Sequence, residues 1–151
     1  MISSIKTVSV VGDRYRFLVT GEQTGGAYAM FDFYVPSQHG PPPHVHHRED
    51  EVFYILEGEF DFHVAGQTYR LEPGQTIFGK RDIPHSFQCV SPTPGRMIVT
   101  VSPAGLEKFF EEVGTELAGP DAEPITATQV ELQNMFAAAP RFGLELLIPS
   151  A

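Results

Sequence analysis

The sequence is poor in several features that decide where a protein can work. It contains one cysteine, Cys89, and no tryptophan among 151 residues, so an intrachain disulfide is excluded. No apolar run approaches the roughly 18 residues that a membrane-spanning helix needs. Residues 1–6 lack the charged and apolar blocks of a signal peptide. We therefore expect a cytoplasmic protein that does not enter a membrane.

Basic residues are also scarce. Ten Lys and Arg stand against nineteen Asp and Glu, which gives a formal net charge of −9 and a pI near 5.0. Phosphate backbones and anionic lipid surfaces repel such a chain, so we expect neither nucleic acid nor a membrane as a partner. The sequence also shows no Ser-His-Asp arrangement, phosphate-binding loop or dinucleotide fingerprint.

Aromatic residues, glycine and proline are abundant. The chain has twelve Phe, five Tyr, fourteen Gly and thirteen Pro, and 42% of its residues are hydrophobic. Short alternating runs are separated by turn sequences such as Gly12-Asp13, Ala65-Gly66 and Pro73-Gly74. Many short strands joined by tight turns are typical of a closed barrel or a two-sheet sandwich within one domain.

The pattern changes near the end of the chain. Residues 103–113 carry apolar side chains at helical spacing, and Gly114 is expected to end that helix. Residues 126–139 predict a second helix, which Pro140 ends, and residues 143–148 form a short apolar tail. Two such helices cannot form a core of their own, so we expect them to pack on the outside of the barrel.

A group of histidines is the most distinctive feature of the sequence. His44 and His46 are two residues apart, and on a strand such residues point to the same face. Glu51 follows shortly after, and His85 belongs to a separate strand-like segment. Three imidazoles and a carboxylate suit a borderline transition metal and leave coordination positions open for chemistry.

Two neighbouring acidic residues compete with Glu51 for the role of ligand. Glu51 shares strand parity with Phe53 and Ile55, so it is expected to point inward with them. Glu49 has the same parity but lies in a turn, where parity is a poor guide, and it ranks second, ahead of Asp50.

The other histidines and the cysteine have simpler interpretations. His47 has the opposite parity to the ligands and is expected at the surface or beside a ligand, and His63 is expected on a solvated strand face. His39 is expected in a loop, and a role for it at the rim of the site is left as an alternative. Cys89 has no base or cation nearby in sequence, which indicates a buried, inert thiol.

Two segments of the chain resemble the motifs of the cupin family. Residues 43–58 are similar to its first motif, which runs His-x-His, three or four residues, Glu, six residues and Gly. Residues 74–85 are similar to its second motif, which supplies the last His. The stretches 40–59, 84–87 and 103–105 further resemble single-domain cupins similar to quercetin 2,3-dioxygenase, so the likeness covers roughly residues 28–148.

The resemblance implies a fold and a domain organisation. The fold would be all-β, a double-stranded β-helix or jelly-roll barrel of six to eight strands, with the two C-terminal helices outside it. Residues 1–151 would be a single domain, with a barrel core at about 28–102 and a helical extension at 103–151. Such proteins are often dimeric, so a homodimer is expected.

The resemblance also implies a metal site. His44, His46, Glu51 and His85 would bind one divalent transition metal, which could be Fe, Mn, Ni, Cu, Co or Zn. The chain departs from the second motif at three positions, namely Lys80, Asp82 and Cys89. These changes bear on the turn before His85 and on the substrate more than on metal binding.

Phe53, Phe87 and Met97 are the expected lining of a substrate pocket beside the metal. By resemblance the protein would be a metal-dependent dioxygenase acting on a small aromatic or enolic molecule, flavonol-like or diketone-like. Glu51 would be a ligand and could also act as the base that takes the substrate proton. Two alternatives stay open, because one fold hosts many functions: a non-catalytic cupin that binds a small molecule, and a metal-dependent isomerase or lyase.

Overall fold

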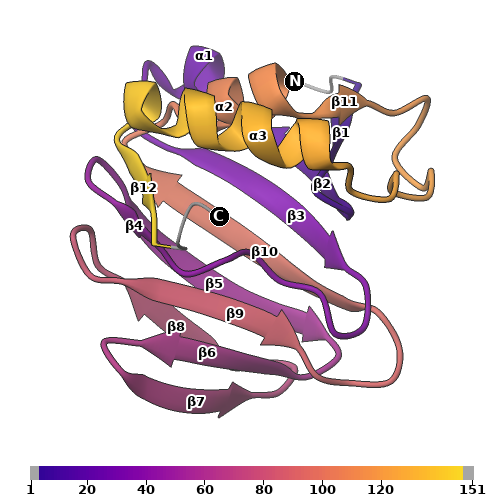
Figure 1. Ribbon diagram of the computed structural model, residues 1–151, viewed down its shortest axis with the longest axis vertical. Helices are drawn as coiled ribbons and strands as arrows, with labels where there is room; N and C mark the ends of the chain where they lie inside the picture. Colours follow the sequence, from indigo (N-terminus) through magenta and orange to yellow (C-terminus); the bar gives the residue numbers. More distant parts are fainter. Residues whose placement is uncertain (1–3, 148–151) are drawn as a thin grey trace.

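Two antiparallel sheets face each other across the core (Figure 1). The computed structural model describes residues 4–147. Residues 1–3 and 148–151 lie outside the described residues, and with them the last residue of the expected apolar tail. Seven strands form the larger sheet, in the order β11-β1-β2-β3-β10-β5-β8, and five form the smaller one, in the order β12-β4-β9-β6-β7.

The expected jelly-roll architecture is confirmed, and short strands at the sheet edges enlarge it. The larger sheet consists of β1 (Lys6–Val10), β2 (Asp13–Val19), β3 (Ala29–Val35), β5 (Asp50–Glu57), β8 (Thr76–Gly79), β10 (Gly95–Ser102) and β11 (Thr115–Glu116). The smaller sheet consists of β4 (His44–His46), β6 (Phe60–Val64), β7 (Gln67–Leu71), β9 (His85–Cys89) and β12 (Leu144–Leu146). The expected core at 28–102 thus begins with β3, while β1 and β2 extend the same sheet.

Strand alternation places one face of each sheet in the core. On β10, Met97, Val99 and Val101 are fully buried, and Val99 lies between Phe31 of β3 and Phe53 of β5. Each such side chain contributes roughly 1.5–3 kcal/mol on transfer from water.

The first hairpin turns one residue earlier than the sequence suggested. Its two central residues are Val11 and Gly12, with φ values of 48° and 87°, and Asp13 already begins β2. Positive φ at both central positions is the conformation whose twist matches the flanking strands.

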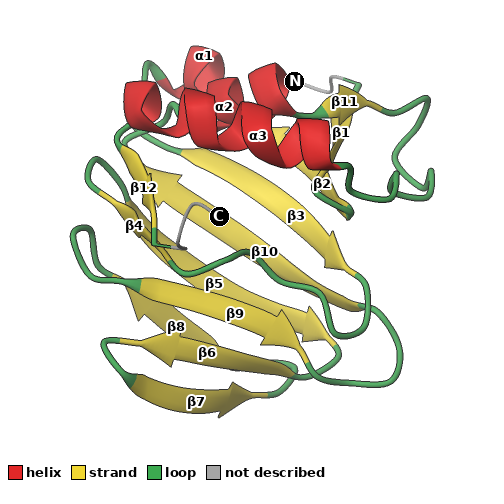
Figure 2. Ribbon diagram, in the orientation of Figure 1, coloured by secondary structure: helices red, strands yellow, loops and turns green. Residues whose placement is uncertain are grey.

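The helices gather over one end of the sandwich (Figure 2). They are α1 (Gly21–Thr24), α2 (Leu106–Val113), α3 (Gln129–Ala138) and the 3₁₀ turn η1 (Ala139–Phe142). Both expected C-terminal helices are present, and the Thr128 side chain accepts a hydrogen bond from the Glu131 amide to begin α3. Both lie outside the strands, but α2 buries Phe109 and Phe110 in the same core as the barrel.

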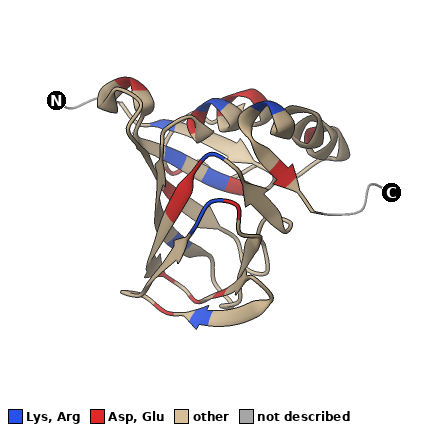
Figure 3. Cartoon of the chain, turned by 90° about the vertical axis from the view of Figure 1, so that its left-hand side faces the viewer, with Lys and Arg blue, Asp and Glu red and all other residues tan. Residues whose placement is uncertain are grey.

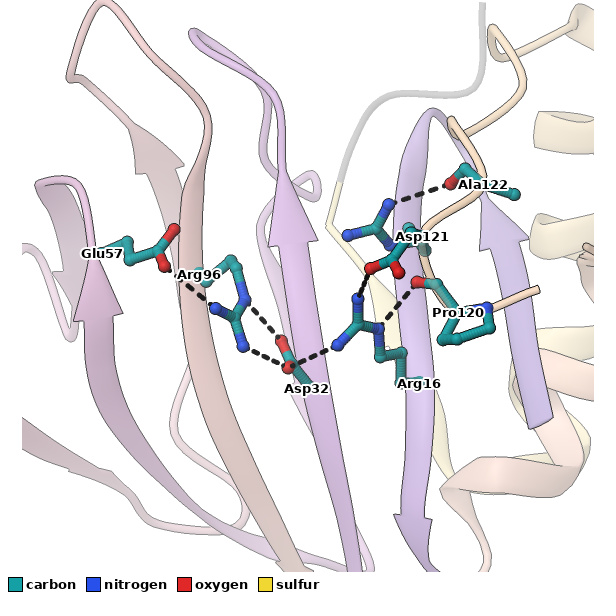
Figure 4. Close-up of polar contacts among 8 residues, drawn as sticks. Arg16, Asp32, Glu57, Arg96, Pro120, Asp121 and Ala122 are labelled. Carbon is teal, nitrogen blue, oxygen red and sulfur yellow. Dashed lines mark hydrogen bonds and ion pairs between the residues drawn. The ribbon is translucent and has the colours of Figure 1, made fainter. Parts of the chain in front are cut away.

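The outer face of the larger sheet carries an ion-pair network (Figure 4). Asp32 of β3 accepts hydrogen bonds from Arg96 Nε and Nη2 at 3.3 and 2.6 Å. Arg16 of β2 approaches Asp32 at 3.6 Å, and Arg96 also donates to Glu57 at 3.0 Å. This network joins four adjacent strands. In the side view of Figure 3, basic residues lie beside acidic ones.

Candidate metal centre

His44, His46, Glu51 and His85 meet at the end of the sandwich beneath the helices. His44 and His85 are register partners on β4 and β9, and Glu51 reaches across from β5 of the opposite sheet. One ligand atom of each residue lies within 4.8 Å of the others, and all four residues are buried. The structure therefore brings together the four residues that the sequence indicated.

A glycine allows β4 to be placed beside β9. The segment that leads into β4 runs against β9, and a Cβ added at Gly40 would stand 1.8 Å from the Phe87 carbonyl oxygen. On the other side, β12 pairs with β4, with Leu144 opposite His46 and Leu146 opposite His44. The apolar tail expected at residues 143–148 thus contains a strand, β12, which pairs with the strand that carries His44 and His46.

Hydrogen bonds orient two of the imidazoles. His44 Nδ1 lies 2.7 Å from the Pro42 carbonyl oxygen, and His85 Nδ1 lies 3.3 Å from the Ile83 carbonyl oxygen. A carbonyl can only accept, so we assign the protons to Nδ1 in both rings. This tautomer leaves both Nε2 atoms free to bind a metal, which is the usual arrangement in histidine metal sites.

The Glu49 carboxylate lies behind the third imidazole. It is 3% exposed, and its Oε2 lies 3.3 Å from His46 Nδ1. Meanwhile His46 Nε2 faces Glu51 Oε1 at 3.5 Å. Glu51 therefore occupies the centre of the cluster, and Glu49, the second candidate from the sequence, supports His46 from outside.

Buried atoms without hydrogen bonds show that the cluster fits a metal ion. Glu51 Oε2 and His85 Nε2 are only 2.9 Å apart, yet both are buried without a hydrogen-bond partner. Buried polar atoms are costly when unpaired, and a cation shared by these atoms would satisfy both. Three imidazole nitrogens and a carboxylate oxygen are also the donors that suit divalent transition metals.

The protonation states of His44 and Glu51 agree with metal binding. Burial, together with the neighbouring His46 and His85, lowers the pKa of His44 to about 3. Burial alone would raise the pKa of Glu51, but the histidines around it lower that pKa to about 2. His44 is therefore neutral and Glu51 ionised at neutral pH, and these are the forms that bind metals. Burial alone would lower the pKa of His46, but the Glu51 and Glu49 carboxylates raise it, so a metal would displace a proton from this imidazole.

Comparisons with known proteins agree with this geometry. The family profile described as Cupin domain matches residues 31–101, which contain all four cluster residues. Quercetin 2,3-dioxygenase from Aspergillus japonicus is 31% identical over 120 residues, or 75% of this chain and 34% of that protein. The chain belongs to the cupin superfamily.

Other relatives support the same assignment. Quercetin 2,3-dioxygenase from Bacillus subtilis is 30% identical over 118 residues, or 72% of this cupin and 34% of that protein. An RmlC-like cupin from Shewanella frigidimarina superposes with a TM-score of 0.58 at 25% identity, covering 67% of this cupin and 86% of that chain. This cupin spans about a third of the length of the two dioxygenases.

A cavity adjoins the metal cluster in this cupin. Its volume, measured as the space open to the centre of a water molecule, is about 60 Å³. One water needs roughly 10–15 Å³ on this measure, so the cavity holds a few waters or a small ligand. The expected residues Phe53 and Phe87 lie on its wall. Met97 is fully buried among the core strands and is not among the residues that line the cavity.

Sequence reasoning did not identify the rest of the cavity wall. Tyr15 of β2 and Phe33 of β3 contribute to it from the larger sheet, and Phe109 of α2 and Met135 of α3 close it from above. Strand parity could have marked Tyr15 as inward-facing. It could not have shown which inward residues lie near the metal.

Two further histidines and the cysteine are not part of the cluster. His47 is exposed, with Nδ1 2.7 Å from Asp82 and Nε2 3.3 Å from Glu145. His63 is exposed and contacts Thr68 at 2.8 Å. Cys89 is fully buried on β9. These are the environments that the sequence indicated.

One departure from the second cupin motif has a clear structural consequence. Asp82 adopts a φ of 68°, in the left-handed region that Gly and, less often, Asp and Asn adopt. Its amide donates to the His46 carbonyl oxygen at 2.9 Å. The turn before His85 is thus hydrogen-bonded to β4, with Asp82 at the position of the left-handed residue.

Proposed function

We propose that this cupin is a metal-dependent dioxygenase acting on a small aromatic or enolic substrate, flavonol-like or diketone-like. One observation carries the proposal: three imidazoles and a carboxylate, three of whose buried atoms lack hydrogen bonds, open onto an apolar cavity. The names of the two curated relatives favour the same reaction class.

His44, His46, Glu51 and His85 would hold one divalent metal, which could be Fe, Mn, Ni, Cu, Co or Zn. When bound, a redox-active metal supplies the electronic coupling between an electron-rich substrate oxygen and dioxygen. The low pKa of Glu51 keeps its carboxylate ionised, which suits a metal ligand. To take the proton of an enol or phenol as well, Glu51 would need a higher pKa in the substrate complex, because an effective general base has a pKa near the working pH.

The cavity wall gives the remaining contributions of the protein. Phe53 and Phe87 present aromatic surface to a planar substrate. Phe109 and Met135, from the helices, cover the cavity and keep water out of it. Because the helices complete this wall, we propose that residues 1–151 act as one domain, with the barrel at about 28–102 and the extension at 103–151.

The small cavity favours diketone-like substrates over larger ones. A volume of about 60 Å³ leaves room for a compact ligand, whereas the three rings of a flavonol require the helical cover to move. The alternatives are a cupin that only binds a small molecule, and an isomerase or lyase in which the metal acts as a Lewis acid.

Metal analysis and oxygen uptake test the proposal together. The full chain should carry a stoichiometric redox metal, measured by inductively coupled plasma mass spectrometry, and should consume oxygen with 2,4-pentanedione or 3-hydroxyflavone. Stoichiometric zinc would favour the isomerase or lyase. No oxygen uptake by metal-loaded protein across a broad panel would favour the binding protein.

The proposal also includes a cytoplasmic homodimer. The outer face of β5 and β8 exposes Val52, Tyr54 and Phe78, which are 42%, 42% and 57% accessible. Val52 and Phe78 are register partners beside the edge strand β8, so a second copy could cover this apolar surface. Light scattering on the purified protein would give the oligomeric state.

In the described part of the chain, no helix is long and apolar enough to cross a membrane.

A further inference from the structure

Tyr15 has a distinct place in the cavity wall. Among the described residues that line the cavity, those outside the metal cluster are aliphatic, aromatic, proline or methionine, and Tyr15 is the one that carries a hydroxyl group. Its ring is held by stacking on Phe33 at 3.8 Å between centroids and by a tilted contact with Phe110 at 4.7 Å. The hydroxyl is therefore carried by a rigid support.

The hydrogen bonding of this hydroxyl is incomplete. Tyr15 is 6% exposed, and its Oη donates to Asp13 Oδ2 at 3.5 Å. Hydroxyl hydrogen bonds are usually 2.7–2.8 Å long, so this contact is weak. Buried hydroxyl groups normally have a good partner. The capacity of Tyr15 to bond a further group is therefore largely unused.

Asp13 and His39 continue the polar contacts of Tyr15 on the side that faces away from the cavity. Its carboxylate is buried, its Oδ1 has no hydrogen-bond partner, and this oxygen lies 3.6 Å from Nδ1 of the half-exposed His39. Burial raises the pKa of Asp13 well above its usual value. Burial and the neighbouring Asp13 and Glu51 carboxylates likewise raise the pKa of Tyr15, so the phenol stays protonated and can donate.

We infer that the Tyr15 hydroxyl is a second recognition point for the substrate, to which it turns the single proton that it otherwise donates weakly to Asp13. This inference rests on the proposed function, in which the metal cluster takes one substrate oxygen. The Tyr15 hydroxyl then bonds a second oxygen of the same molecule. The substrate class is thereby narrowed to compact molecules with two separated oxygen atoms, one bound at the cluster and the other at Tyr15.

Matched probes separate recognition by Tyr15 from metal binding. Metal-loaded wild-type protein and the variants Tyr15→Phe and Tyr69→Phe are titrated with 2,4-pentanedione, which has two oxygens, and with azide, which binds the metal alone. Tyr69 is exposed on β7, where its hydroxyl donates to Gln67 of the same strand at 2.8 Å, so its variant controls for loss of a hydroxyl. Binding is followed by the visible absorption of the cobalt-loaded protein.

In the Tyr15→Phe variant the metal content should be unchanged. Its Kd for pentanedione should rise about fivefold to tenfold, the effect of one neutral hydrogen bond, while its Kd for azide stays within about twofold. Tyr69→Phe should match the wild type with both probes.

Two results would overturn the inference and leave the proposed function intact. In the first, Tyr15→Phe binds pentanedione as tightly as the wild type, which means that both oxygens sit on the metal. In the second, the variant loses azide and pentanedione affinity equally, which means that Tyr15 only supports the site. A wild-type protein that holds metal but binds no pentanedione would overturn the diketone class and the inference together. A wild-type protein that retains no metal would overturn the proposed function itself.

Discussion

His44 and His85 lie directly opposite each other on β4 and β9, with their ring centroids 4.5 Å apart. This single register pair joins the two cupin motifs, which are about forty residues apart in the chain. The cluster therefore depends on the pairing of β4, a strand of three residues, with its neighbours on both sides.

Removal of a ligand should abolish metal binding. We expect His85→Ala to lower the metal content from about one ion per chain to near zero. The three ligands that remain would hold a transition metal far less tightly than four. His63→Ala removes an exposed imidazole from β6 and should leave the metal content unchanged. Metal analysis after dialysis makes the measurement, and full retention in His85→Ala would refute the site.

Glu49 should tune the site without being a ligand. We expect Glu49→Gln to weaken metal affinity about 10-fold to 100-fold, the usual effect of losing a carboxylate behind a ligating histidine. Stoichiometry at saturating metal should stay at one ion. Glu51→Gln should lower the metal affinity further than Glu49→Gln does. Glu72 is exposed, and Glu72→Gln should leave the metal affinity unchanged. Competition with a chromophoric chelator gives the affinities; equal effects of the Glu49 and Glu51 variants would contradict the assignment.

The close approach at Gly40 should make that position intolerant of any side chain. A Cβ there would lie 1.8 Å from the Phe87 carbonyl oxygen, so the segment before β4 must move away from β9. We expect Gly40→Ala to cost about 2 kcal/mol of unfolding free energy, within the usual range for overpacking, and to weaken metal binding. At Gly119 an added Cβ meets nothing within 4 Å. Urea denaturation of Gly119→Ala is thus the control, and equal stability of both variants would rule out the close approach.

Asp13 should make stability fall as the pH rises. Its pKa is raised in the folded state by burial, so the folded protein binds this proton more tightly than the unfolded chain, whose pKa is about 3.9. The free energy of unfolding therefore decreases as pH rises from about 4 through the folded-state pKa. In Asp13→Asn this contribution is absent, so stability relative to the wild type should improve between pH 4 and pH 8. Urea midpoints across this range provide the test, and a constant difference between the two proteins would contradict it.

Much of the architecture follows from local sequence. Both helices after residue 102 and the turn at Ala65-Gly66 lie where helical spacing and turn residues indicated them, and Glu51 lies on a strand with Phe53 and Ile55, as its parity indicated. These signals are local: they depend on side-chain periodicity and on the backbone freedom of a few residues. Boundaries shifted by up to three residues, as at Thr128, where the capping hydroxyl rather than the apolar pattern begins α3.

The sequence by itself determined the chemistry of this protein: the donor types at His44, His46, Glu51 and His85, and the strand parity that turned Glu51 inward. Tertiary structure decided what surrounds them. It paired Leu144 with His46 and brought Tyr15 to the cavity. The physical reason is that these contacts join segments up to about a hundred residues apart. Their positions are set by sheet register and by packing of the whole core, which no local pattern encodes.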